Sequence, residues 1–338
     1  MPESVLITSG SSVWAHHLIL RLSAGGFRIR IAIRPGDDIQ QQKNLLSNLD
    51  IDPLQVTFVD IRPLETGGWA EALDGCHYVC HSLLPKQDTR ERTEQPSVST
   101  TRDELMKLIQ SARNEIDMKR IVIISSICSA TGIGEKQAKS VRDETHWNNI
   151  ADQAASLQVR SITYAERALW DYVASTNAGL EITTLLSGFL IGPRLGESPT
   201  LAMSIFNNLL DGRYPGLPRL GGCLTDARDL AEAQFRALTS PQAAGQRYMV
   251  AGEFIWMSEA AAILRQVFPQ MRDVISAVAL PDAIIHLLKP FYPELKEITP
   301  LLGREYRVST DKLEAQLGMT LRENSYILTD TARSMIGR

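Results

Sequence analysis

The sequence lacks the features that mark membrane-spanning, secreted and nucleic-acid-binding proteins. No apolar run approaches the roughly 20 residues that a membrane-spanning helix needs. The N-terminal stretch MPESVLITSG has no basic segment followed by a long apolar one, as a secretory signal peptide would have. The 35 basic and 39 acidic residues are scattered and leave a net charge of only −4, which argues against nucleic acid or an anionic membrane as a partner. We therefore predict a soluble, cytoplasmic protein.

Cysteine is scarce and not arranged as a motif. The four cysteines, Cys76, Cys80, Cys128 and Cys223, form no CxxC pair and no spacing typical of a metal site. No cluster of acidic residues and histidines indicates a metal either. We expect four reduced thiols and no bound metal.

What the chain does contain is a regular alternation of short apolar runs and helical patterns through its first half. The run RIVIIS is continuously apolar, as a strand buried on both faces should be. Such alternation predicts an α/β fold with a Rossmann-type, doubly wound parallel sheet. The expected strands are Val5–Thr8, Arg28–Ile33, Gln55–Val59, Tyr78–Ser82, Arg120–Ser125 and Glu181–Leu186.

The length of 338 residues exceeds what one compact core usually holds, and the pattern changes after Gly192-Pro193. We expect residues 1–190 to form a domain of the dinucleotide-binding type. Residues 191–338 should form a smaller, mostly helical substrate lobe, with residues 221–252 returning to pack on the first domain.

Five motifs occur in an order that is typical of one family. In these segments the chain resembles the extended short-chain dehydrogenase/reductase family, closest to its dihydroflavonol reductase and cinnamoyl-CoA reductase branch. The resemblance covers nearly the whole chain and implies the fold, but function belongs to sites rather than to folds. The motifs are GCHYVCHSLLP (Gly75–Pro85), RIVIISS (Arg120–Ser126), DETHW (Asp143–Trp147), LTDARDLA (Leu224–Ala231) and QRYMVAGEFIWMSEAAAIL (Gln246–Leu264).

The phosphate-binding turn of the family departs from its pattern in this chain. The pattern TGxxGxxG, aligned from Thr8, places Ser9, Ser12 and Ala15 at the three glycine positions, while the one glycine, Gly10, lies elsewhere. Those glycines allow a tight turn, close approach of the backbone to the pyrophosphate and close helix packing. We therefore expect either no cofactor or weakly retained NADP.

Other cofactor positions persist in the resemblance. It places Arg34 where the family uses a basic residue for the 2′-phosphate of NADP, and Asp60 at an acidic residue near the adenine. The alternative is that both are solvated charges at strand ends. The full set of implied cofactor positions is Ser9, Gly10, Ser12, Ala15, Arg34, Asp60 and Leu83.

The family's acid–base pair is missing. Its motif YxxSKxxAE aligns with QVRSITYAE, which places Gln158 at the tyrosine and Ile162 at the lysine. Neither side chain titrates, so the family's general acid–base step has no group here. The family's serine is matched by Ser126, whose alternative role is to cap a turn at the strand end. Glu166 of the AE pair is expected to have a helix-packing or surface role.

The histidines do not supply a substitute by their spacing. His16, His17, His81 and His146, together with Tyr164, form no recognisable triad. His81 is expected to be structural, with a hydrogen bond to the backbone beneath the site.

Three functions are compatible with this sequence. The leading hypothesis is a repurposed biosynthetic enzyme that performs non-redox chemistry, an isomerase, cyclase or lyase. Ser126 and Gln158 would orient the oxygens of an apolar or aromatic small molecule. The alternatives are an atypical NADP-dependent reductase or epimerase, and a non-catalytic ligand-binding or partner protein. The expected assembly is a monomer or a homodimer.

Overall fold

The structure of the chain is a computed structural model. It describes residues 2–34, 37–61, 68–84, 98–131, 140–151, 155–176, 179–196, 200–288 and 299–336. Within these ranges, no helix combines the length and the apolar character needed to cross a bilayer.

The core of the molecule is a seven-stranded parallel sheet with the order β10-β6-β5-β4-β1-β2-β3. The first six strands give the doubly wound order that the alternation of the sequence predicted. β10 extends the sheet beyond β6 and was not among the strands expected from the sequence. The strands are β1 (Ser4–Ile7), β2 (Arg28–Ile33), β3 (Val56–Asp60), β4 (Tyr78–Ser82), β5 (Arg120–Ser126), β6 (Glu181–Ser187) and β10 (Gln246–Val250).

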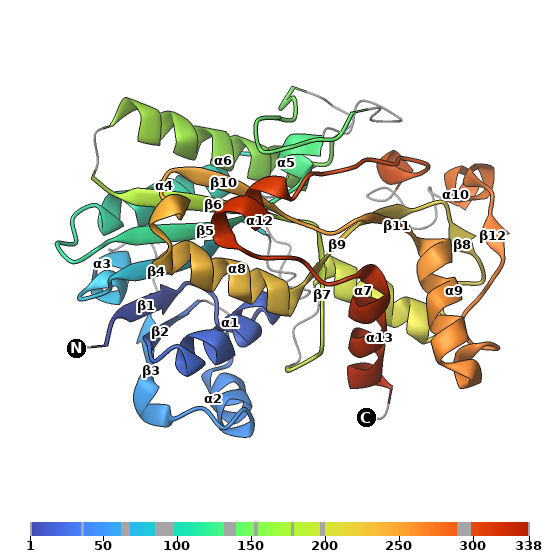
Figure 1. Ribbon diagram of the computed structural model, residues 1–338, viewed down its shortest axis with the longest axis horizontal. Coiled ribbons are helices and arrows are strands. Elements are labelled where there is room, and N and C mark those ends of the chain that lie inside the picture. Colours follow the sequence, from blue (N-terminus) through green and yellow to red (C-terminus); the bar gives the residue numbers. More distant parts are fainter. Residues whose placement is uncertain are drawn as a thin grey trace.

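Helices cover both faces of this sheet (Figure 1). Because successive side chains of a strand point to opposite faces, Val122 and Ile124 pack with α1 and α8, whereas Ile121 and Ile123 pack with α4 and α6. The α-helices of the described residues are α1 (Val13–Ala24), α2 (Ile39–Asn48), α3 (Gly68–Leu73), α4 (Thr100–Ala112), α5 (Cys128–Thr131), α6 (Leu157–Ser175), α7 (Leu201–Leu210), α8 (Ala227–Thr239), α9 (Met257–Val267), α10 (Asp282–Leu288), α12 (Asp311–Leu317) and α13 (Asn324–Met335).

A smaller lobe follows the sixth strand and lies on the right in Figure 1. Its sheet has the order β11-β9-β7, with a separate two-stranded ladder of β12 and β8. These strands are β7 (Phe189–Ile191), β8 (Leu217–Pro218), β9 (Gly221–Asp226), β11 (Phe254–Trp256) and β12 (Ala279–Leu280). Short 3₁₀ turns complete the path: η1 (Pro53–Gln55), η3 (Pro241–Ala243), η4 (Pro269–Met271) and η5 (Thr299–Leu301).

The chain passes between the two parts more than once. After β9 in the smaller sheet, α8 packs against α1 and β10 joins β6 in the large sheet. The chain then returns to the small sheet through β11. The carboxyl ends of the large sheet's strands therefore face the smaller lobe, which is where ligands bind in open α/β sheets.

Candidate active site

The turn between β1 and α1 forms without backbone strain although serine and alanine occupy the family's glycine positions. Among the described residues, the only non-glycine residue with positive φ is Asp50, so Ser9 and Ser12 are unstrained. Ser12 caps α1 in an extended conformation (φ −91°, ψ 153°). Its hydroxyl donates to the carbonyl oxygen of Ser9 at 3.2 Å and is thus directed back into the turn. The N-terminus of α1 retains the backbone geometry that attracts an anion.

The displaced glycine has a packing role. A Cβ on Gly10 would lie 2.4 Å from Cγ2 of Ile31 and 2.6 Å from Oε1 of Gln42. Real side chains do not approach so closely, so only glycine lets this turn lie against β2 and α2. The unusual position of the glycine therefore reflects contact with the neighbouring strand and helix.

Arg34 lies directly after β2 with part of its guanidinium unsatisfied. Its Nε is buried and has no hydrogen-bond partner, and burial lowers the pKa of the side chain. The charge of Arg34 also lowers the pKa of His81, at the end of β4. Because β4 and β2 flank β1, the guanidinium lies near the centre of the carboxyl edge. A buried, unpaired donor at this place is suited to an anionic group.

The other implied cofactor positions are spread along the same edge. Ala15 is fully buried in α1. Asp60 is exposed at the last position of β3, in register with Ile33 of β2. Leu83 is buried and donates its backbone N–H to the carbonyl oxygen of Ile124 at 2.9 Å.

Ser126 ends β5 at this edge. Its hydroxyl accepts a hydrogen bond from the backbone N–H of Cys128 at 3.2 Å, which is the turn-capping role that the sequence left open. The residue is only half-buried, and it pairs in register with Ser187 at the end of β6. The same serine thus caps α5 and presents an oxygen at the carboxyl edge.

Gln158 and Ile162 lie one turn apart near the start of α6. Gln158 is exposed, and among the described residues no hydrogen bond joins it to Ser126. Ile162 is 3% exposed and belongs to the apolar cluster of α4 and α6. The environment of Ile162 is therefore that of a core residue, and it offers no charged partner for a phenol.

Glu166 was expected to have either a helix-packing or a surface role, and the structure rules out the surface role. It is fully buried and pairs with Arg247 of β10, with 2.9 Å between Oε1 and Nε. The side-chain hydroxyls of Ser125, Ser129 and Thr184 also donate to its carboxylate, at 2.6, 2.7 and 3.1 Å.

Arg247 joins two further motifs to this carboxylate. Its guanidinium stacks 3.7 Å from the ring centroid of Trp147 and donates to the carbonyl oxygen of His146 at 3.1 Å. Four of the matched segments, ISS, DETHW, AE and QRYM, therefore meet directly behind Ser126. In the sequence these motifs are separate matches, and nothing in it indicates that they are in contact.

The histidines hold separate elements and form no triad. His81 bonds through Nδ1 to the hydroxyl of Thr8 at 2.8 Å, and the expected bond to the backbone stays a prediction. Nε2 of His17 lies 2.9 Å from the carbonyl oxygen of Pro193, after β7. His146 pairs locally with Asp143 at 2.8 Å. Tyr164 faces α4, where its hydroxyl accepts from Arg102 at 3.0 Å.

Burial of two histidines predicts an acid-sensitive fold. Burial lowers the pKa of His16 to about 4 and that of His81 to about 3. In the unfolded chain both take up a proton near pH 6.5, so below that pH the unfolded state binds more protons. We expect the free energy of unfolding to fall by up to about 1.4 kcal/mol per pH unit for each histidine between about pH 6 and 5.

Urea unfolding at a series of pH values measures this slope. His81→Asn should make it shallower by about one proton. His286→Asn is the matched control, because His286 is exposed, and it should keep the wild-type slope. An unchanged slope in the His81 variant would contradict the assignment.

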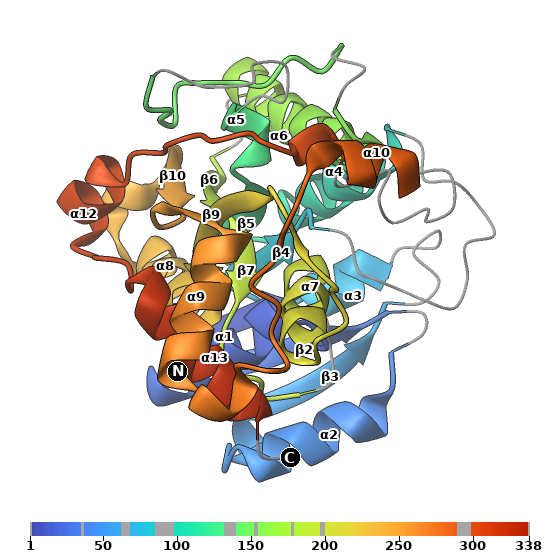
Figure 2. The same ribbon diagram turned by 90° about the vertical axis from the view of Figure 1, so that its right-hand side faces the viewer.

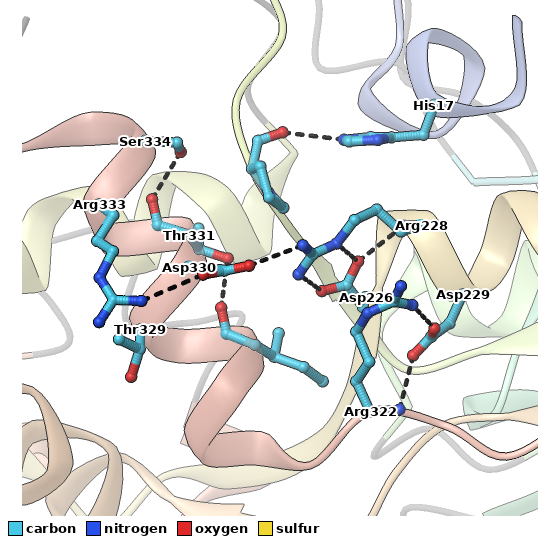
Figure 3. Close-up of polar contacts among 12 residues, drawn as sticks. His17, Asp226, Arg228, Asp229, Arg322, Thr329, Asp330, Thr331, Arg333 and Ser334 are labelled. Atoms are coloured by element: carbon cyan, nitrogen blue, oxygen red, sulfur yellow. Dashed lines mark hydrogen bonds and ion pairs between the residues drawn. The ribbon is translucent and has the colours of Figure 1, made fainter. Parts of the chain in front are cut away.

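Ion pairs connect α8 to β9 and to α13, as Figure 3 shows. Arg228 of α8 pairs with Asp226 and with Asp330 of α13, each at 2.7 Å. Arg322 pairs with Asp229. The backbone N–H of Arg194 donates to the hydroxyl of Ser334 at 2.9 Å. Together these contacts hold α13 against the segment that follows β7.

An apolar cavity of about 90 Å³ lies within the smaller lobe. It has no charged lining residue, and Phe189, Phe206, Trp256 and Met257 are among its walls. Phe189 follows two residues after Ser187, the register partner of Ser126. Such a lining is suited to an apolar or aromatic molecule. Within the described ranges, no group of three or more His, Cys, Asp or Glu side chains is placed to hold a metal.

The chain is similar to known reductases over almost its whole length. No family model matches it. It is 25% identical over 311 residues to cinnamoyl-CoA reductase CAD2 of Medicago truncatula, covering 89% of this chain and 90% of that protein. It is 26% identical over 359 residues to the ketoreductase azaE of Aspergillus niger, covering 99% and 98%.

A solved structure shares the fold. Yeast methylglyoxal/isovaleraldehyde reductase Gre2, complexed with NADPH, superimposes with a TM-score of 0.78 over 98% of each chain, at 17% identity.

Proposed function

Because the chain belongs to the extended short-chain dehydrogenase/reductase family, in its dihydroflavonol reductase and cinnamoyl-CoA reductase-like branch, we propose that it is an NADP(H)-dependent reductase. Its substrate would be a small carbonyl compound with an apolar or aromatic body. The relatives are named as reductases, which favours this function over the non-redox chemistry that the sequence alone ranked first.

One observation carries the proposal, namely the buried and unpaired Nε of Arg34 at the carboxyl edge. The fit to NADP rests on this donor and on the intact turn, where the N-terminus of α1 would hold the pyrophosphate and Arg34 the 2′-phosphate. When bound, the nicotinamide supplies the hydride that the carbonyl carbon accepts. An anion would satisfy a donor that otherwise remains unpaired at a cost in stability.

The chain's own residues would bind and orient the substrate. The apolar cavity next to Phe189 would take its body. Ser126 and Gln158 would hold its oxygen by hydrogen bonds, because both side chains donate and neither titrates near neutral pH. A positioned general acid raises the reaction rate by roughly 100- to 10,000-fold. Without a further proton donor, the reaction would therefore be slow.

A second function is favoured by the burial of Ile162. An apolar core residue occupies the lysine position, so α6 cannot hold the charged tyrosine–lysine pair of the family there. Non-redox cyclisation, isomerisation or elimination would then proceed without nucleotide turnover. In that case the same cavity and the same two polar side chains would serve.

The test is a titration of the purified protein with NADPH, followed by tryptophan fluorescence. The consumption of NADPH is then measured with isovaleraldehyde and with methylglyoxal. We expect saturable quenching and carbonyl-dependent loss of NADPH absorbance. Saturable binding without consumption of NADPH would favour the second function. No binding at millimolar NADPH would refute the first.

A further inference from the structure

A tyrosine far along the chain reaches the region of Ser126. Tyr306 lies between η5 and α12, in a segment that crosses the molecule beside α5 (Figure 2). The segment is fixed by Arg142, whose N–H donates to the carbonyl oxygen of Arg307 at 2.8 Å. The ring of Tyr306 meets Phe254 edge-on, with centroids 5.3 Å apart. It packs against the small apolar cluster that contains Ile127, the residue after Ser126.

The hydroxyl of Tyr306 lies deeper than the rest of its side chain. The residue is only half-buried, but its hydroxyl end is surrounded by protein, which raises its pKa well above the ordinary value. The thiols of Cys128 and Cys223 lie close enough to act on it electrostatically. Cys128 in turn contacts the hydroxyl of Ser126. Cys128 therefore contacts the Ser126 hydroxyl and also interacts electrostatically with the phenol.

The same hydroxyl also borders the apolar cavity. A Cβ on Gly222 would lie 3.2 Å from the Tyr306 oxygen and 2.1 Å from the Phe189 ring, and both Gly222 and Phe189 line the cavity. Glycine at this position leaves room for the phenol beside the cavity wall. The phenol is therefore a polar group beside a space whose lining carries no charge.

We propose that Tyr306 is the phenolic proton donor that this chain lacks at position 158. The inference rests on the reductase function proposed above. As the carbonyl carbon accepts a hydride, the π electron pair of the C=O bond moves to the oxygen, and that oxygen takes the proton of the Tyr306 hydroxyl. The carbonyl compound is reduced to an alcohol and NADPH is oxidised to NADP⁺. The phenolate then recovers a proton from water.

The first experiment needs no nucleotide and no turnover. Cinnamaldehyde is added to the protein, because the absorption band of a conjugated aldehyde moves to longer wavelength when its oxygen accepts a hydrogen bond. We expect this red shift with the wild type and its loss with Tyr306→Phe. Tyr326→Phe is the matched control, because Tyr326 is half exposed on α13, and it should behave as the wild type.

The second experiment measures turnover of isovaleraldehyde with NADPH. Tyr306→Phe should lower kcat by about 100- to 10,000-fold and leave NADPH affinity unchanged. Replacement of Tyr306 by 3-fluorotyrosine, which keeps the shape of the ring and lowers the phenol pKa, should move the alkaline limb of the kcat profile to lower pH. The 3-fluorotyrosine variant also tests the role of Tyr306 if the Tyr306→Phe variant folds poorly.

The outcomes separate the two proposals. A red shift that depends on Tyr306, without consumption of NADPH, would refute the reductase function and leave Tyr306 as the donor to the carbonyl oxygen. An unchanged spectrum and unchanged kcat in Tyr306→Phe would overturn the role of Tyr306 and leave the reductase function intact. Absence of both the shift and turnover in the wild type would refute both.

Discussion

Glu166→Gln is expected to lower the free energy of unfolding by about 3–5 kcal/mol, because it leaves the Arg247 charge buried without its partner. The carboxylate is fully buried and the guanidinium is nearly so. Three hydroxyl groups are oriented to donate to the carboxylate, and an amide nitrogen cannot accept from them. The loss is measured by urea unfolding at neutral pH.

A matched control separates burial from charge. Glu232 pairs with Arg21 and Arg236 on the surface, where the side chain is 26% exposed. Glu232→Gln should cost no more than about 1 kcal/mol, as exposed ion pairs do. If the two variants lose similar stability, the buried pair does not hold the motifs together. The Glu166 variant should also disturb Ser126, since Ser125 and Ser129 on either side of it donate to the carboxylate.

Arg34→Leu is expected to raise the dissociation constant of NADPH by about 10- to 100-fold and to leave that of NADH nearly unchanged. A charge-assisted hydrogen bond contributes about 1.5–3 kcal/mol, and each 1.4 kcal/mol is a factor of ten. Only NADPH carries the 2′-phosphate, so the effect should separate the two dinucleotides. The carboxylates of Asp37 and Glu104 act on the same guanidinium. These two negative charges repel a bound phosphate, so we expect the dissociation constant of NADPH to rise by about 10-fold, the lower end of this range.

Fluorescence titration with each dinucleotide measures this difference, and added salt should reduce it. Arg28→Leu is the control, because Arg28 is exposed at the opposite end of the same strand and should not affect either ligand. Equal weakening of NADPH and NADH by Arg34→Leu would mean that the residue supports the fold of the turn and does not contact a phosphate.

Local patterns predicted much of the fold. The six expected strands match the observed ones to within about one residue at each end, since buried parallel strands are short continuous apolar runs. For the helix at the catalytic motif, the apolar periodicity predicts residues Gln153–Ala174. The observed helix begins at Leu157, where the Ser156 hydroxyl accepts from the N–H of Val159 at 3.3 Å. Residues 152–154 lie outside the described residues. The strand β10 was missed because its pairing with β6 is a long-range contact.

The candidate site was less accessible from sequence. Alignment of motifs identified Ser126, Gln158, Ile162 and Arg34 as positions, and their roles remain predictions. It gave no sign of Tyr306, a single tyrosine in the irregular stretch GREYRVST, because no periodicity or spacing marks a residue that reaches a site through a loop. Only its packing against Phe254 and against the apolar cluster that contains Ile127 indicates that role.

By itself, the sequence determined the alternating α/β architecture and the order of the five motifs, and it predicted the absence of the family's tyrosine and lysine. These are properties of neighbouring residues and of apolar periodicity. The tertiary structure decided which of them meet. It paired Glu166 with Arg247 across 81 residues and left Arg34 with a buried unpaired donor. It also gave Gly10 its contact with Ile31 and packed Tyr306 against the cluster that contains Ile127. Such contacts depend on how elements distant in the chain pack, and burial and charge act only once that packing exists.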